Sequence, residues 1–288
     1  MKFDQVTSIY QRPYLAPEVP EVFFVKLGGA LITYKDAYCK PNVPVIREFA
    51  RNIAADWPEL RGRLIVVLGG GSYGNAVPYR YNLRESTQDW RAVDLSMMTT
   101  RTLKLMSLVT EIFRREKIPS YPFQTCSYLS TTAGRPERVF LEPICHALSL
   151  GVLPILSGDL VFDSDRDFVI FSSDSIPELF AARLAIKRVV MLTNVPGVMD
   201  YSTGNPELIP RVTPDNRPDV LNHAGASTQQ DVSGGMNNKV RALLRMAELG
   251  VESVICDGRE PANLRRGLFD SIPPGTFVPA QTVEIKEA

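Results

Sequence analysis

Short apolar runs alternate with stretches of helical periodicity along most of the chain. Apolar runs bounded by glycine or polar residues predict buried strands at 22–27, 64–68, 152–156, 189–193 and 253–256. Apolar positions at helical spacing predict helices over 43–60, 91–117, 175–185 and 235–249. Strands that alternate with helices are typical of a mostly parallel sheet covered on both faces, so we expect an α/β fold.

Other segments have weaker patterns. Apolar residues at 161–162 and 168–171 flank the polar stretch 163–167, and this arrangement predicts a β-hairpin. Three prolines and little periodicity predict an extended arm over 1–20, and the prolines within 206–218 predict a loop. Because no linker-like segment interrupts the pattern, we expect residues 1–288 to form a single domain.

Composition and charge remove several classes of protein. With 44% hydrophobic and 22% charged residues, the chain has the composition of a globular protein and not of a disordered one. The 32 Lys and Arg residues balance the 32 Asp and Glu residues, which argues against nucleic-acid binding through bulk charge. Residues 1–8 lack the apolar segment of a signal peptide, and no apolar run approaches the roughly 18 residues of a membrane span. We therefore expect a cytoplasmic protein with no membrane partner.

The cysteines and histidines predict no metal site. Cys39, Cys126, Cys145 and Cys256 lie far apart in the sequence and form no C-x-x-C pair, which favours buried free thiols over a disulfide framework or zinc site. The two histidines, at positions 146 and 223, also lack the spacing of metal ligands.

Glycine-rich turns follow several of the predicted strands, at 28–29, 69–71, 158 and 197. In a parallel sheet these turns gather at the carboxyl ends of the strands, where ligands bind. Helix N-termini present free backbone N–H groups there, and glycine lets a phosphate group approach them closely. The repeated pattern therefore predicts a polyanionic ligand.

One of these turns, at 69–74, matches the dinucleotide-binding pattern G-x-G-x-x-G. That pattern also needs an acidic residue at the end of a second strand about 20 positions later. Asp89 and Asp94 are near that distance, but they introduce or lie within a predicted helix. The dehydrogenase interpretation is therefore disfavoured, and the Walker A pattern is absent from the sequence.

Lysines accompany the glycine turns. Lys26 lies inside an apolar strand two residues before a glycine pair, Lys35 follows nine residues later, and Lys239 lies in the first turns of a predicted helix. An unpaired buried ammonium group is costly, so Lys26 must reach solvent or meet an anion. Together the three lysines suit phosphoryl transfer, which relies on positioning and electrostatics. Asp174 is a candidate to organise them, or to cap a helix; Asp159 is a candidate polar anchor or turn residue.

Five motifs in this order resemble the amino acid kinase superfamily, in the branch that contains isopentenyl phosphate kinase and fosfomycin kinase. They are residues 26–30 with Lys35, 69–74, 157–159, 192–198, and 231–236 with Lys239. The segments 49–52 and 171–174, with Pro177 and Glu178, are more similar to fosfomycin kinase.

The resemblance implies a three-layer αβα sandwich with a central, mostly parallel sheet, usually assembled as a homodimer. It implies that residues from about 21 to 155 bind the phosphoryl acceptor and that residues from about 156 to 288 bind ATP. It also implies Mg²⁺ held mainly by the ATP phosphates, as is common for this ion. By family analogy the helix 91–117 and the stretch 118–150 shape the acceptor pocket. Tyr79, Tyr81, Trp90, Met97 and Met98 either line that pocket or pack in the core.

The resemblance also implies roles for single residues. Lys26 and Lys239 would contact the transferring phosphoryl group, Lys35 would stabilise its charge or hold the acceptor, and Asp174 would orient the lysines. The implied acceptor-binding residues are Gly28, Gly29, Ala30, Gly70, Gly71, Ser72, Gly74, Asn75, Ser157, Gly158 and Asp159. The implied nucleotide-binding residues are Lys26, Gly28, Ser172, Ser173, Asp174, Thr193, Asn194, Val195, Gly197, Val198, Gly234, Gly235, Met236 and Lys239.

Asn75 departs from the family pattern, which has a histidine that binds the acceptor's phosphate or phosphonate at this position. Asparagine donates a hydrogen bond but cannot become cationic, so its contact with an anion lacks charge assistance. Arg80 and Arg84 are candidates to supply that charge. We expect an ATP-dependent kinase of a small phosphonate or phosphate monoester, similar to fosfomycin kinase. The alternatives are the same fold acting on isopentenyl phosphate or on a carboxylate, carbamate or alcohol, and a non-catalytic nucleotide sensor.

Overall fold

The computed structural model describes residues 20–34, 37–74, 76–81, 83, 90–202, 205–223 and 235–281. Its main feature is a seven-stranded sheet in the order β13-β12-β9-β1-β2-β6-β3. All neighbouring strands in it are parallel except β12 and β13. The bounds of its strands are β1 Val22–Leu27, β2 Leu64–Leu68, β3 Ser120–Pro122, β6 Leu153–Ser157, β9 Ile186–Thr193, β12 Glu252–Asp257 and β13 Thr276–Val278.

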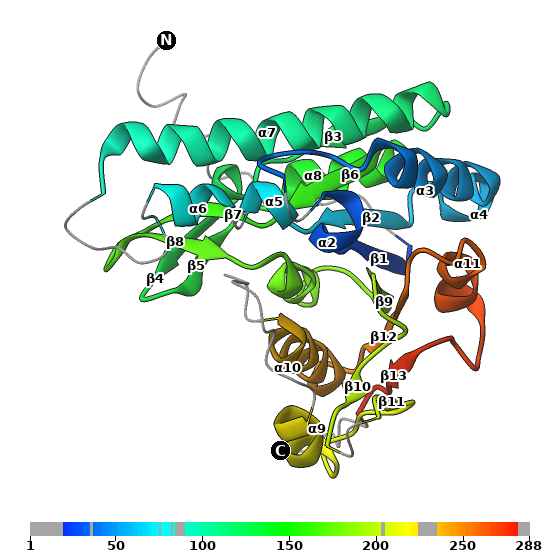
Figure 1. Cartoon of the computed structure of the whole chain (residues 1–288). Coiled ribbons are helices and arrows are strands. Elements are labelled where there is room, and N and C mark those ends of the chain that lie inside the picture. The colour runs from blue at the N-terminus through cyan, green and yellow to red at the C-terminus, as the bar shows by residue number, and fades with distance from the viewer. Residues whose placement is uncertain are drawn as a thin grey trace, which may run out of the picture.

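Helices cover both faces of this sheet, which confirms the expected three-layer α/β fold. Alternate side chains of the central strands pack against α3 (Val43–Ala55), α7 (Ala92–Arg115) and α11 (Ala262–Phe269) on one face. The remaining strand side chains pack against α8 (Glu142–Ser149) and α10 (Gly235–Glu248) on the other face. In Figure 1, α7 lies along the top of the molecule and α10 near the bottom.

A four-stranded sheet in the order β5-β4-β7-β8 lies beside the main sheet. Its strands are β4 Leu129–Thr132, β5 Arg135–Val139, β7 Asp159–Asp163 and β8 Asp167–Phe171. Strands β7 and β8 form the antiparallel hairpin that the sequence predicts. The carboxylate of Asp163 accepts the backbone N–H groups of Gly134 and Arg166 at 2.7 and 2.9 Å, and thereby joins the turns of two hairpins.

Short elements connect these layers. The α-helical ones are α2 Gly29–Ile32, α4 Trp57–Leu60, α5 Gly71–Gly74, α6 Ala76–Arg80 and α9 Arg217–His223. The 3₁₀ turns are η1 Thr125–Ser127, η2 Ser173–Ser175 and η3 Pro177–Phe180, and a two-stranded pair joins β10 Met199–Asp200 to β11 Glu207–Leu208.

Some predicted boundaries are wrong. The predicted helix 43–60 is two helices, because the chain turns at Asp56 before Pro58. The predicted helix 175–185 is wrong: the segment holds short 3₁₀ turns, and the Ser172 hydroxyl accepts the Asp174 N–H at 3.2 Å where they begin. The predicted loop 206–218 contains β11 and the start of α9. The predicted arm over 1–19 lies outside the described residues.

All four cysteines are free thiols, two of them buried and two half-buried. Within the described ranges, no cluster of three His, Cys, Asp or Glu side chains could hold a metal ion. None of the helices that the structure describes is long and apolar enough to cross a membrane.

Candidate active site

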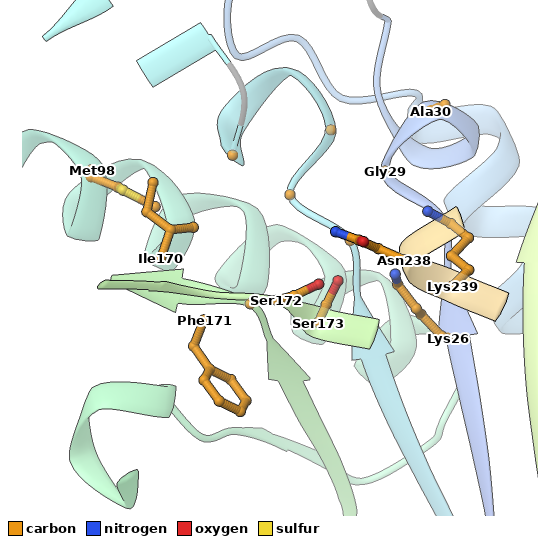
Figure 2. Close-up of a pocket in the computed structure, with 15 residues that line it drawn as sticks. Lys26, Gly29, Ala30, Met98, Ile170, Phe171, Ser172, Ser173, Asn238 and Lys239 are labelled. Atoms are coloured by element: carbon orange, nitrogen blue, oxygen red, sulfur yellow. The ribbon is translucent and has the colours of Figure 1, made fainter. Parts of the chain in front are cut away.

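A cavity of about 210 Å³ opens at the carboxyl ends of β1, β2 and β6, where the sequence analysis places the ligand. The loop after β8 and the first turns of α10 complete its wall (Figure 2). Its lining residues are Lys26, Gly29, Ala30, Gly69, Gly70, Gly71, Gly74, Met98, Gly158, Ile170, Phe171, Ser172, Ser173, Asn238 and Lys239.

Two lysines form the charged end of the cavity, and both pair with one buried aspartate. The Lys26 side chain projects from the buried strand β1, and its ammonium group pairs with the Asp174 carboxylate. The Lys239 ammonium group, on α10, lies 3.6 Å from the other carboxylate oxygen. Lys26 and Asp174 are only 4% and 2% exposed. The three predicted catalytic residues that the structure describes therefore come together although they are far apart in the sequence.

The two ammonium groups control the ionisation of Asp174. Burial alone would raise the pKa of this carboxyl, but the charges of Lys26 and Lys239 and the hydrogen bonds from Lys26 and Ser172 outweigh it and hold the pKa below its usual value. Asp174 is thus a carboxylate at neutral pH. The cluster of two cations and one anion keeps a net positive charge, which suits the binding of phosphate oxygens.

The two glycine turns pack backbone against backbone. A Cβ atom on Gly29 would lie 2.1 Å from the Gly71 nitrogen, and one on Gly69 would lie 2.4 Å from the Gly29 nitrogen. Gly71 also has a φ of +49°, which favours glycine. The Thr33 hydroxyl accepts the Ser72 N–H at 2.9 Å and donates to the Gly29 carbonyl at 2.8 Å. These contacts hold α2 and α5 together beside the lysines.

The turn between β6 and β7 contributes only its glycine to the cavity. A Cβ atom on Gly158 would lie 2.8 Å from the Ser173 nitrogen, so this turn packs directly on η2. The flanking side chains, which the sequence analysis predicts to bind substrate, are not among the lining residues. The Ser157 hydroxyl donates to the Met106 sulfur at 3.1 Å, and the Asp159 side chain is fully buried.

Met98 and Ile170 form an apolar end of the cavity, opposite the lysines (Figure 2). Met98 comes from α7 and Ile170 from β8, and both pack with the buried Leu160. The sequence analysis names Met98 as a candidate but misses Ile170 and Asn238. For Ile170 the available signal was the alternation of side chains along β8. For Asn238 it was the position directly before Lys239. Trp90 stacks edge-on against Phe168 and is half-buried.

The predicted nucleotide-binding residues fall into two groups. Ser172 and Ser173 line the cavity together with the two lysines. The segment 193–198 is not among the lining residues. There the Thr193 hydroxyl donates to the Val195 carbonyl at 2.9 Å, and Val198 is buried in the core. Residues Gly28, Gly235 and Met236 also lie outside the lining, at the N-terminal ends of α2 and α10.

The remaining residues named in the sequence analysis either lie outside the described residues or lie away from the cavity. Lys35, Asn75, Arg84, Asp89 and Gly234 lie outside the described residues. Arg80 is exposed and lies over the Tyr38 ring, 5.1 Å from its centroid, and it does not line the cavity. Asp94, weighed above as the acidic residue of the dinucleotide-binding pattern, lies in the first turn of α7 and accepts a hydrogen bond from the Arg91 side chain at 2.8 Å.

The fold and the lysine-lined cavity identify the class of protein. The chain matches the Amino acid kinase family over residues 21–257 and belongs to that family. Its relatives include isopentenyl phosphate kinase of Methanothermobacter thermautotrophicus, 32% identical over 89% of this chain and 98% of the relative. Isopentenyl phosphate kinase of Arabidopsis thaliana is 27% identical over 86% of this chain and 92% of the relative.

A solved structure of isopentenyl phosphate kinase is also similar to the chain, with a TM-score of 0.75 and 27% identity. The match covers 89% of this chain and 100% of the solved one. These relatives support the isopentenyl phosphate alternative better than the fosfomycin kinase interpretation that the sequence analysis places first.

Proposed function

We propose that this chain is an ATP-dependent kinase that transfers the γ-phosphoryl group to isopentenyl phosphate or a closely similar phosphate monoester. One observation carries the proposal: the cavity has two lysines at one end and Met98 and Ile170 at the other. Such a site fits a small molecule that has an anionic phosphate and a short hydrocarbon chain. The similarity to isopentenyl phosphate kinases over nearly their whole length supports the same substrate.

In the proposed reaction an oxygen of the acceptor phosphate attacks the γ-phosphorus of ATP. A new P–O bond forms, the bond to the β-phosphate oxygen breaks, and ADP leaves with the electron pair. The acceptor phosphate is already ionised at neutral pH, so the step needs no general base. Lys26 and Lys239 would stabilise the charge on the transferring group, and Asp174 would hold both ammonium groups in place.

Both oxygens of Asp174 face the two lysines, one paired with Lys26 and the other 3.6 Å from Lys239. We propose that Mg²⁺ is therefore held by the ATP phosphates and not by a protein cage, and that it neutralises charge on them. In this arrangement the backbone N–H groups of the glycine turns and the hydroxyl groups of Ser172 and Ser173 would supply the remaining hydrogen bonds.

We also propose the division of labour that the family resemblance implies, with the acceptor bound mainly by residues from about 21 to 155 and ATP by residues from about 156 to 288. The apolar Met98 and the glycine turns after β1 and β2 lie in the first part, and Gly158, Ser172, Ser173 and Lys239 lie in the second. Ile170 is the exception, because it belongs to the second part but lies at the apolar end.

ADP release with Mg·ATP tests the proposal when isopentenyl phosphate, fosfomycin, simple phosphonates, carboxylates and carbamate are supplied in turn. We expect isopentenyl phosphate to give the highest kcat/KM. Activity confined to acceptors without phosphorus would overturn the choice of acceptor. Tight ATP binding without turnover on any acceptor would instead support a nucleotide sensor.

A further inference from the structure

The carboxyl group of Asp159 lies next to the cavity wall in the sequence, and the proposed reaction does not use it. Asp159 is the first residue of β7, directly after the cavity-lining Gly158, and it is fully buried. It pairs across the hairpin with Phe171. Among the described residues, no lysine, arginine or histidine forms an ion pair with it. A buried carboxyl without a cationic partner is costly, and such departures from ordinary packing rules concentrate at functional sites.

Polar groups from two other segments and from its own strand converge on this carboxyl. Gln124, which precedes η1, donates through its amide nitrogen at 3.2 Å. The Leu160 backbone N–H donates at 2.9 Å, and the Thr102 side chain on α7 is close enough to the carboxyl to lower its pKa. Both α7 and η1 pack against β7. Asp159 therefore connects the long helix to the β7–β8 hairpin, whose Ile170 and Phe171 line the cavity.

These contacts lie directly beside the apolar end of the cavity. Thr102 is one helical turn after Met98, so both side chains face the same side of α7. Leu160, the next residue after Asp159, pairs across the hairpin with Ile170. Met98, Leu160 and Ile170 pack together in one small cluster. The contacts of Asp159 thus connect α7, which presents Met98, to the β7–β8 hairpin, which presents Ile170.

We infer that Asp159 is a positioning residue that sets the gap between Met98 on α7 and Ile170 on β8, and so selects the length of the acceptor's hydrocarbon chain. The inference rests on the proposed function, because it assumes an acceptor with an apolar part. Asp159 acts through other residues and does not line the cavity itself. Burial raises its pKa to about 6 against the hydrogen bonds from Gln124 and Leu160, which agrees with a carboxyl held in an apolar surrounding.

Steady-state kinetics with five-carbon and ten-carbon alkyl phosphates tests this role in Asp159→Asn, with ATP as the second substrate. We expect the KM for the five-carbon acceptor to rise about five-fold, the effect of losing about one buried hydrogen bond. The KM for ATP should change by less than about two-fold, and the preference for five over ten carbons should fall by about five-fold. Asp165→Asn is the matched control, because it makes the same change at the exposed tip of the same hairpin.

A second pair of variants keeps the test decisive if Asp159→Asn does not fold. Thr102→Val removes the hydroxyl from α7 and should shift the chain-length preference in the same direction, whereas Thr102→Ser keeps the hydroxyl and should restore it. An unchanged length preference in Asp159→Asn and Thr102→Val would overturn the inference, and so would an equal loss of kcat for both acceptors. The absence of any turnover by the wild type would instead contradict the proposed function.

Discussion

At the scale of single residues, the proposed function assigns the chemistry to the two lysines that line the cavity. Lys26→Met and Lys239→Met each remove one cation next to the transferring phosphoryl group, so we expect kcat to fall by about 10²–10³-fold. The measurement is ADP release with isopentenyl phosphate and Mg·ATP. Lys187→Met is the matched control, because Lys187 is exposed near the amino end of β9, whereas the cavity lies at the carboxyl ends of the strands. Retention of most of the wild-type kcat by both lysine variants would contradict their assignment.

We expect Asp174 to contribute to stability as well as to the proposed reaction, because it pairs with two ammonium groups inside the protein. Asp174→Asn would leave Lys26 buried without its carboxylate and facing Lys239. We expect a loss of about 3–5 kcal/mol in the free energy of unfolding, together with a fall in kcat. Urea unfolding at pH 7 measures the first effect, with the exposed Asp215→Asn as control. Wild-type stability in Asp174→Asn would show that the lysines do not need this partner.

At the scale of elements, the close packing of α2 on α5 predicts that alanine substitution at two glycines has very different effects on stability. Gly29→Ala places a methyl group against the backbone of Gly71, so it should destabilise the fold by at least about 3 kcal/mol or prevent folding. A methyl group on Gly74 meets nothing within 4 Å, so Gly74→Ala should change the unfolding free energy by less than about 1 kcal/mol. Thermal unfolding compares the two variants. Equal stabilities would contradict the contact between the turns.

The same elements show what could be predicted from the sequence. The central strands were predictable because both their faces are buried, which leaves continuous apolar runs such as Leu64–Leu68. Strand β5 was missed because all its residues are exposed, and a polar strand of this kind has no apolar alternation. The segment 175–185 has helical periodicity, but Pro177 and the Ser172 hydroxyl bond favour short 3₁₀ turns there.

The sequence predicted some residues of the candidate site and missed others. Lys26, Asp174 and Lys239 were named from the glycine turns and the family resemblance, and the structure brings them together, although no local pattern shows that residues 148 positions apart will touch. Ser157 and Asp159 were placed at the substrate because residues 157–159 are part of the family resemblance, but both side chains are buried and neither lines the cavity. Ile170 was missed because an apolar residue in a strand is first interpreted as core.

For the whole molecule, the buried Asp159 predicts how stability depends on pH. Its folded-state pKa of about 6 lies above the usual value near 3.9, so the folded state binds the proton more tightly than the unfolded state. Stability should therefore fall by up to about 3 kcal/mol as the pH rises from about 4 to about 6, and then this contribution stays constant. Cys126 and Tyr128 are the nearby titratable groups, and burial raises the pKa of both well above this range.

Asp159→Asn isolates this contribution, because the amide does not ionise. Urea unfolding of wild type and variant at pH 5 and pH 8 measures it, and the difference between the two proteins should shift in favour of the variant at pH 8. A difference that stays the same at both pH values would contradict a raised pKa for Asp159.

The two proposed binding halves are not separate bodies in the sheet. Strand β9, from the second half, lies between β12 and β1, so the main sheet is continuous across the division. The cavity is lined from both sides of it. The homodimer that the family resemblance implies stays a prediction, which sedimentation velocity would check through the mass of the particle in solution.

The central claim is that the γ-phosphoryl group of ATP moves to an oxygen of isopentenyl phosphate. Phosphorus NMR of a reaction with Mg·ATP tests this most directly, because it identifies the product as well as the loss of ATP. We predict ADP together with new, mutually coupled resonances of an organic diphosphate, which should appear at least about 100-fold more slowly with Lys239→Met. Formation of ADP with free inorganic phosphate alone, or an unchanged isopentenyl phosphate signal, would contradict the claim.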